Sequence, residues 1–344
     1  MTEPSWDAAA YLPPARLDAI TDARVQRPQL VAQEAKRRRR RPKLSPDGKL
    51  ILAALDHPGR GVTEIRGDPL AMGDRHQYLA RARRVLDDPD LDGVMATADV
   101  LEELLILCAL ERAETGRGFF DGRVLVGSMN RGGLQGTVFE MDDTFTAMSA
   151  ARIAELGFDG GKMMYRLDPQ DPASGRTILA CAQALNDLRR HRLAGFLEPL
   201  GVAKTGSGWS PVKDAATLVR QCGIAAALGD SSLHLWLKVP IVEGLKRVCH
   251  ATTLPLLLLG GPARGTAEET LADFAGGFAA GPRVRGAIVG RNLLYPGADD
   301  PLPLCRALTA LAHRGATLGE AQRVLHEPAP ARPGSSGAKP RRRR

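Results

Sequence analysis

Eight short apolar segments recur along the chain, and longer segments of helical period separate them. Nearly every residue in these segments is apolar, which is typical of parallel strands buried on both faces. Strands alternating with helices predict a parallel sheet covered by helices, and eight such units predict a closed (β/α)8 TIM barrel. The predicted strands are residues 50–56, 93–97, 123–129, 160–165, 195–200, 233–239, 254–260 and 285–291.

Helical period is clearest in residues 99–113, where Val100, Leu104 and Leu107 fall on one stripe. An open doubly wound sheet is the alternative fold, but no GxGxxG motif follows the first strand to favour a dinucleotide site. We therefore prefer the barrel and expect no cofactor. Further helices are predicted near residues 71–86, 142–156, 177–192, 212–228, 241–250, 266–279 and 302–314.

The chain has 344 residues, of which 44% are hydrophobic, enough for one large core. Residues 15–41 have the pattern of a polar helix that Pro42 stops. We predict a helical lead-in with a basic run over residues 1–45 and a single barrel domain over 46–318. Residues 319–344 are rich in Pro, Gly and Arg and are predicted to form a disordered basic tail.

The net charge of +8 comes from two short runs. Residues 36–41 supply six positive charges, and Lys339 with residues 341–344 supplies five, so removing these eleven turns +8 into −3. Basic runs can bind nucleic acid, but no aromatic residues interleave these two to stack on bases. Nucleic acid is therefore not the expected partner, and solvated or structural arginines are preferred.

Nothing in the sequence predicts a membrane protein or a metal site. The N-terminus lacks a basic segment followed by an apolar stretch, and no run approaches the ~18 apolar residues of a membrane helix. The five cysteines form no CxxC pair and no metal-type spacing, which fits a reducing compartment. We expect a soluble cytoplasmic protein without a metal, and a homo-oligomer is compatible with the sequence.

Four ionisable residues lie at or near the carboxyl ends of predicted strands. Asp56 closes the first strand, Lys162 lies in the fourth, Glu198 in the fifth and Lys238 in the sixth. In a TIM barrel, the side chains at this end of the strands meet at one face. We therefore expect Lys162, Glu198 and Lys238, on three neighbouring strands, to converge in the lumen.

Lys238 is the candidate nucleophile. Pleat alternation places it on one face of the sixth strand with His234 and Trp236, while leucines occupy the other face. Burial and a second amine, that of Lys162, lower the pKa of a lysine, and a free amine adds to carbonyls to form a Schiff base. Glu198 is the candidate for moving protons at a substrate hydroxyl. The alternatives are a surface position for Lys238 and structural ion pairs of Lys162 with Glu198 or Asp56.

The loops after the last two strands are the common phosphate site of this fold. Here they begin with Gly260 and Gly261, and with Gly290 followed by Arg291. Glycines let backbone N–H groups approach an anion, and arginine supplies a forked donor. Asn130 and Arg131, after the third strand, are further candidates for substrate binding.

These motifs resemble the class I, Schiff-base-forming aldolases of the tagatose-1,6-bisphosphate aldolase kind, over about residues 48–300. The matching elements are Leu237-Lys238-Val239, Glu198-Pro199-Leu200, Lys162 with Tyr165 and Asp168-Pro169, Asp56 with Arg60 and Gly61, and Gly290-Arg291. The resemblance implies that Lys238 forms the imine, that Glu198 is the acid and base, and that Arg60 helps to bind substrate. It also implies that Asp56 orients a substrate hydroxyl.

The segments DHPGRG, GSMNRGG, FEMDD, GGKMMYR, LEPL, WLKVP, TTLPLLLLGG and VGRNLLYP are similar to an aldolase-like family associated with inositol catabolism. That resemblance includes the arginine-rich stretch and implies a structural role for it. The chain departs from the tagatose enzymes at two places. No glutamate separates Val239 from Pro240, and His57 and Pro58 are inserted after Asp56.

The sequence therefore predicts a class I aldolase that cleaves a phosphorylated keto-sugar. The substrate implied by the second resemblance is 5-dehydro-2-deoxygluconate 6-phosphate. Two alternatives stay open. One is a sugar-phosphate isomerase or epimerase without an imine, and the other is a nucleic-acid-binding protein that uses its arginine runs.

Overall fold

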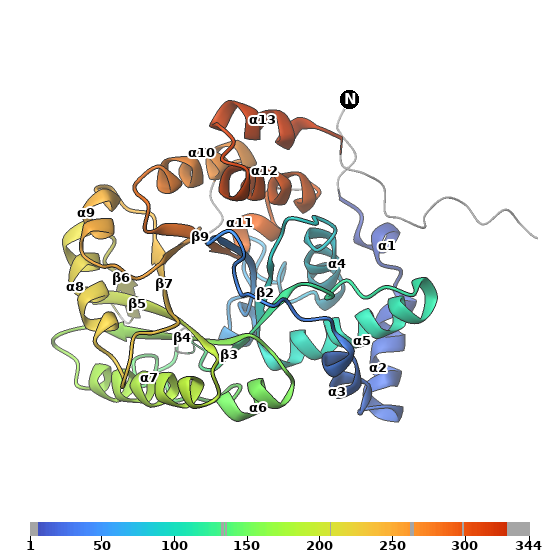
Figure 1. The fold of residues 1–344 in the computed structure, drawn as a ribbon, viewed down its shortest axis with the longest axis horizontal. Helices are drawn as coiled ribbons and strands as arrows, with labels where there is room; N and C mark the ends of the chain where they lie inside the picture. The colour runs from blue at the N-terminus through green and yellow to red at the C-terminus, as the bar shows by residue number, and fades with distance from the viewer. Residues whose placement is uncertain are drawn as a thin grey trace, which may run out of the picture.

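The computed structural model describes residues 6–131, 134, 136–206, 208–261, 265–297 and 299–328. Eight parallel strands close into a ring, and helices lie around its outside (Figure 1). The prediction of a (β/α)8 barrel is confirmed. Around the ring the strands follow the order β4 (Gly160–Leu167), β3 (Val124–Ser128), β2 (Gly93–Ala96), β1 (Leu50–Leu55), β9 (Val284–Val289), β8 (Leu256–Leu259), β7 (Leu235–Pro240) and β5 (Ala194–Thr205), which pairs with β4.

Pleat alternation divides each strand between the lumen and the surrounding helices. Leu50, Leu52 and Ala54 of β1 pack in the lumen, whereas Ile51 and Ala53 pack outward. The lumen cluster forms an apolar layer beneath the polar residues that follow along the strands. Its other members are Met95, Val124, Val126, Ala194, Phe196, Leu257 and Ile288.

The covering helices follow the predicted segments, with one clear difference. A helix is predicted over 142–156, but α6 spans only Ala150–Glu155. The Ser149 side chain accepts a hydrogen bond from the Arg152 N–H, so the helix begins after Ser149. The other helices are α4 (Arg75–Val85), α5 (Ala98–Thr115), α7 (Ala173–Arg190), α8 (Ala215–Ala226), α9 (Leu245–His250), α10 (Ala267–Phe278), α11 (Arg291–Leu294) and α12 (Pro301–His313).

Several strand boundaries differ from the prediction, and those of β5 and β7 change which residues lie near the site. The fifth strand is predicted to end at residue 200, but β5 continues to Thr205 and turns back into β6 (Gly208–Pro211), which pairs antiparallel with it. The sixth predicted strand begins at 233, but His234 has φ +63°, outside the strand region, and β7 begins at Leu235. His234 is therefore exposed and does not share a strand face with Lys238.

The N-terminal lead-in consists of three helices, α1 (Ala8–Tyr11), α2 (Ala15–Gln26) and α3 (Leu30–Arg37). The lead-in predicted over residues 15–41 is helical, but it is interrupted at Arg27 and its last helix ends at Arg37, before Pro42. Pro28 disfavours helical backbone for the residue before it, and Arg27 has φ −140° and ψ 53°. The resulting break folds α2 and α3 back against α5.

The arginines that follow α3 belong to the barrel's N-terminal end. Arg38 is buried and donates to the carbonyls of Arg123 and Gly157, and its guanidinium lies 3.2 Å from Asp159. Arg41 lies 2.6 Å from Asp92. Asp92 and Asp159 immediately precede β2 and β4, so the basic run neutralises carboxylates at the strand beginnings. This arrangement supports the structural interpretation of the run.

The predicted C-terminal tail begins too early. Residues Leu318–His326 form α13, because Thr317 and Glu320 make a reciprocal capping box at its start. The predicted disorder over residues 329–344 lies outside the described residues, as does the second basic run. Within the described ranges, none of the helices combines the length and apolar character that a membrane crossing requires.

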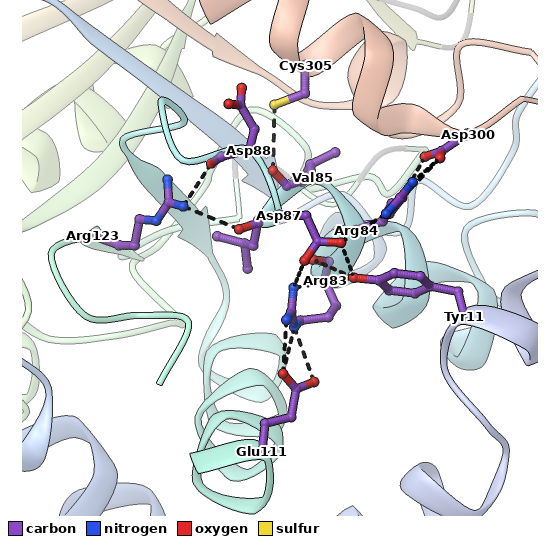
Figure 2. A network of polar contacts seen from close by, with 11 residues as sticks. Tyr11, Arg83, Arg84, Val85, Asp87, Asp88, Glu111, Arg123, Asp300 and Cys305 are labelled. Carbon is purple, nitrogen blue, oxygen red and sulfur yellow. Dashed lines mark hydrogen bonds and ion pairs between the residues drawn. The ribbon is translucent and has the colours of Figure 1, made fainter. Parts of the chain in front are cut away.

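A network of buried charges joins the lead-in to the barrel (Figure 2). Arg83 of α4 lies 2.9 Å from Glu111 of α5 and 2.7 Å from Asp87. The Tyr11 hydroxyl of α1 donates to Asp87 at 2.8 Å. Arg84 makes a similar contact with the start of α12, so α4 holds elements from both ends of the chain.

His313, in the last turn of α12, should make stability depend on pH. Its ring nitrogens lie 2.8 Å from Asp47 and 3.0 Å from Asp92. Burial opposes the charge, but the hydrogen bonds to Asp92 and Asp47 outweigh it and raise the pKa of His313 from 6.5 to about 9. A histidine whose pKa is raised on folding stabilises the protein fully below pH 6.5 and loses that contribution as pH rises through 9.

We therefore expect the free energy of unfolding to fall by about 1–2 kcal/mol more between pH 6.5 and 9 in the natural protein than in His313→Gln, after solvent screening. Urea unfolding at several pH values measures this difference. His326→Gln is the matched control, because His326 is exposed and lies 3.7 Å from Glu268. Parallel pH profiles for His313→Gln and the natural protein would contradict the assignment.

Candidate active site

The barrel brings together the four residues predicted to carry the chemistry. Glu198 of β5 lies between two amines, with its Oε2 2.9 Å from Lys238 Nζ of β7 and 3.1 Å from Lys162 Nζ of β4. Lys162 Nζ is also 3.2 Å from Asp56 Oδ2, directly after β1. Carboxylates and amines thus alternate in a chain that runs Asp56, Lys162, Glu198, Lys238. Their contact follows from the ring order, in which β5 pairs with both β4 and β7.

The chain of charges is buried from one end to the other. Asp56 and Lys162 have no exposed surface, and Glu198 and Lys238 are 4% and 5% exposed. Buried charges of this kind are tolerated only when each is paired, and here every member touches an opposite charge. The prediction that Lys238 points into the barrel is therefore confirmed by its contact with Glu198, while its chemical role stays a prediction.

Burial and the neighbouring charges shift the pKa values of the residues in this buried row of charges. Burial by itself would raise the pKa of Glu198, but the Lys162 and Lys238 cations outweigh it and lower that pKa to about 2. Burial lowers the pKa of Lys238 and Lys162 lowers it further, against the opposing effect of Glu198. Lys162 likewise keeps the pKa of Asp56 below its usual range despite burial. Lys238 is therefore more readily a free amine than an exposed lysine.

A cavity of about 670 Å³ lies above this row of four charged residues, at the carboxyl ends of the strands. Lys238 and Glu198 line its floor, whereas Lys162 and Asp56 are not among the lining residues and lie beneath them. Asp56 was predicted to orient a substrate hydroxyl, but it does not line the cavity. We expect both residues to act on a bound molecule through the charges of Glu198 and Lys238.

The residues predicted to bind phosphate line the same cavity. Gly260 and Gly261 follow β8, and Gly290 and Arg291 follow β9. A Cβ on Gly290 would lie 2.2 Å from the ring of His57, so only glycine fits against that ring. Arg60 also reaches the cavity. The Nε atoms of both arginines are buried and have no hydrogen-bond partner among the described residues. Residues 262–264 lie outside that part of the chain.

Asn130 and Arg131 are not placed as predicted. Asn130 is fully buried, donates to Asp143 and to the Met164 carbonyl, and accepts from the Met164 N–H. Arg131 donates to the Thr146 hydroxyl at the surface. Neither lines the cavity, so both are corrected from substrate binding to support of the loop after β3.

Several cavity residues were not predicted from the sequence. His57 lines the wall, and burial lowers its pKa to about 3, so its ring is neutral at neutral pH. Trp209, in the unpredicted strand β6, and Lys213, just after this strand, also line the cavity. Arg166 continues the inward alternation of Lys162 along β4, a signal present in the sequence but beyond the predicted strand end. Glu140 completes this group from the loop after β3.

The chain matches the model of a family described as Cgl0159-like over residues 48–306. The crystal structure of Cgl0159 from Corynebacterium glutamicum is 35% identical, with a TM-score of 0.81, over 88% of this chain and 98% of that one. A relative described as an uncharacterized aldolase from Saccharolobus solfataricus is 25% identical over 196 residues. That match covers 56% of this chain and 65% of the relative, under two thirds of its length.

A Schiff-base-forming fructose-1,6-bisphosphate aldolase shares the fold at lower similarity. Its structure is 19% identical with a TM-score of 0.54, over 82% of this chain and 100% of that one. At this level of identity the match concerns the barrel architecture alone.

Replacing Lys162 should raise the pKa of Lys238. Lys162→Met removes a like charge that lowers this pKa, so the free-amine fraction should appear at higher pH. The pH dependence of Lys238 acetylation, followed by peptide mass spectrometry, gives the midpoint. In the natural protein this midpoint should lie below 10.5.

The single replacement leaves Asp56 buried without its partner and will destabilise the fold. The double variant Asp56→Asn with Lys162→Met avoids this unpaired charge and keeps the experiment interpretable. Its midpoint should also rise, but by less, because Asp56 raises the pKa of Lys238 and this effect is smaller than the lowering by Lys162. Lys246→Met, on the exposed face of α9, is the control and should leave the midpoint unchanged. A midpoint that falls in the double variant would contradict the arrangement.

Proposed function

The chain belongs to the Cgl0159-like family, and we propose that it is a class I aldolase that cleaves a phosphorylated keto-sugar through a Schiff base on Lys238. The observation that carries this proposal is the position of the Lys238 amine. It lies on the floor of a cavity, is almost fully buried, has a lowered pKa and contacts the carboxylate of Glu198. Burial and a neighbouring cation each favour the nucleophilic free amine of a lysine, and Lys238 has both.

The reaction begins when the neutral amine of Lys238 attacks the substrate ketone and forms a C–N bond. The carbonyl oxygen takes one proton from the amine and one from solvent and leaves as water, and a protonated imine, which keeps the second amine proton, remains on Lys238. Glu198 then removes the proton from the hydroxyl on the second carbon from the imine carbon. The C–C bond next to this hydroxyl carbon breaks. Its electrons form the double bond of the enamine, while those of the C=N double bond move to the nitrogen. An aldehyde leaves and an enamine stays on Lys238. Return of the proton to the enamine carbon and hydrolysis of the imine complete the cycle.

The low pKa of Glu198 is consistent with the way the charge on Lys238 changes during this reaction. The ammonium of Lys162 and the positive charge on Lys238, in its protonated or imine form, hold the pKa of Glu198 down to about 2. Cleavage converts the positively charged imine on Lys238 into a neutral enamine, which removes one of these two cations. The carboxylate therefore gains proton affinity at the step in which it must keep the proton.

The glycines after β8 and β9, with Arg291, are proposed to hold the substrate phosphate. The sequence resemblance suggests 5-dehydro-2-deoxygluconate 6-phosphate as the substrate, with malonate semialdehyde and dihydroxyacetone phosphate as products. This assignment would place the protein in inositol catabolism. The relative described as an aldolase supports the general reaction.

Borohydride reduction tests the imine. We expect the natural protein, incubated with a panel of ketose phosphates and reduced, to gain the mass of one ketose or its ketone fragment on the peptide that contains Lys238. Lys238→Met should gain none, and Lys246→Met should behave as the natural protein. Absence of any adduct across the panel would contradict the aldolase proposal and favour an isomerase or epimerase, which needs no imine.

Glu198→Gln should separate imine formation from cleavage. Adduct formation at Lys238 should persist, because removal of the Glu198 charge lowers the pKa of Lys238 further. Turnover should fall by about 10²–10⁴-fold, the usual contribution of a general acid and base. Glu155→Gln, at an exposed position of α6, should leave turnover unchanged. Equal loss of trapping and turnover in Glu198→Gln would argue against this division of roles.

A further inference from the structure

His57 lies in the wall of the cavity and has no part in the reaction proposed above. It directly precedes a short helix, η1 (Pro58–Arg60), and its carbonyl accepts the N–H groups of Arg60 and Val62. Pro58 fits the first position of this helix because its φ is fixed there and no N–H is needed. The backbone of His57 is therefore held in one conformation near the end of β1.

The packing of the His57 ring leaves one of its nitrogens available to a bound molecule. The side chain is 11% exposed, and because the residue lines the cavity, this exposed part faces it. Nδ1 is buried and has no hydrogen-bond partner among the residues that the structure describes. Gly290 supports the edge of the ring, since a Cβ at that position would overlap with Cε1. Nε2 is therefore the nitrogen that can meet a substrate.

Asp56 favours one tautomer of this ring. Because burial lowers the pKa of His57 to about 3, the ring is neutral and carries a single N–H. Asp56 Oδ1 lies 3.7 Å from Nδ1, beyond hydrogen-bond length, and it too is buried without a partner in the described part of the chain. Burial opposes the charge of Asp56, but Lys162 keeps its pKa below the usual range, so it is a carboxylate. A negative oxygen beside Nδ1 favours the proton there, and Nε2 is then a hydrogen-bond acceptor.

The order of the strands places His57 across the lumen from Glu198. In the ring of eight strands, β1 is the fourth neighbour of β5 in either direction, so the two residues come from opposite walls. Along one side, β9 with the proposed phosphate loop and β7 with Lys238 lie between them. A ketose phosphate joined to Lys238 would therefore have Glu198 on one side and His57 on the other.

The cleavage step restricts where one hydroxyl of such a substrate can point. The C–C bond breaks readily only when it stands perpendicular to the plane of the imine, so that its electrons can enter the double-bond system. The hydroxyl on the carbon next to the imine carbon then lies close to that plane, away from the group that leaves beside Glu198. A hydroxyl enclosed there needs an acceptor on another wall.

We propose that His57 Nε2 accepts a hydrogen bond from this hydroxyl, on the carbon next to the ketone, and thereby selects the ketose phosphates that carry it. The inference rests on the proposed aldolase function and adds a specificity-determining residue to it. The ketone released by cleavage keeps the selected hydroxyl. Dihydroxyacetone phosphate therefore fits the site, and hydroxyacetone phosphate, which lacks that hydroxyl, leaves Nε2 without its partner.

A competition between these two ketones on one protein sample tests the role of His57. They are mixed in equal amounts and trapped with borohydride, and peptide mass spectrometry separates the two adducts on Lys238, which differ by one oxygen atom. We expect the natural protein to form at least about ten times more of the dihydroxyacetone phosphate adduct, because the other ketone leaves a buried acceptor unpaired.

His57→Leu should bring the ratio of the two adducts to within about threefold of one, because the hydroxyl then has no acceptor. His57→Gln should keep part of the preference, since its amide oxygen can take the place of Nε2. Each ratio is measured within one sample, so a smaller folded fraction in a variant does not alter it. His250→Gln, at an exposed position in α9, is the matched control and should give the natural ratio.

The same experiment separates this inference from the function on which it rests. If the natural protein forms no adduct with either ketone, the aldolase proposal itself fails and the role of His57 fails with it. A ratio near one in the natural protein, or a ratio that His57→Leu leaves unchanged, overturns the role of His57 alone. Loss of both adducts in His57→Leu that circular dichroism shows to be folded would also overturn it, because His57 would then act in imine formation and not in selection.

Discussion

The centre of this structure depends on how four charges share a lumen that excludes water. Isolated ions in such a place are costly, by several kcal/mol each, and the barrel tolerates them because acid and amine alternate. Among the residues that the structure describes, Lys162 and Glu198 each have two opposite charges within contact distance, whereas Lys238 has only Glu198. The amine with the least electrostatic support for its proton is therefore the one that faces the cavity.

The two ends of the barrel are built for different purposes. At the N-terminal end, Arg38 and Arg41 neutralise the carboxylates before β2 and β4, and an apolar layer follows inside the ring. At the carboxyl end the lumen opens into a strongly positive cavity, and β6 adds to its wall. The lead-in helices thus belong to the barrel, since the arginines that follow them complete its closed end.

The sequence predicted site residues correctly where two rules apply together. Side chains alternate along a strand, and the functional groups of a barrel lie at the carboxyl ends of its strands. Lys162, Glu198 and Lys238 stand within apolar strands, so their inward direction followed from the pleat. Asn130 and Arg131 lie in a loop that has no such period, and the structure uses them to support that loop. Arg166 was missed because the predicted strand ended one residue before it, and Trp209 because its strand pairs only with the extended part of β5.

The sequence by itself determined the eight strands of the barrel, their order and the side of each strand that faces inward, because these follow from local apolar patterns and short connections. Only the tertiary structure decided which charges pair and which are buried beneath the cavity without lining it. Distances between strands far apart in the chain arise when the ring closes, and no local period specifies them. Closure put Lys162 between Asp56 and Glu198 beneath the cavity, and left Lys238 at its floor.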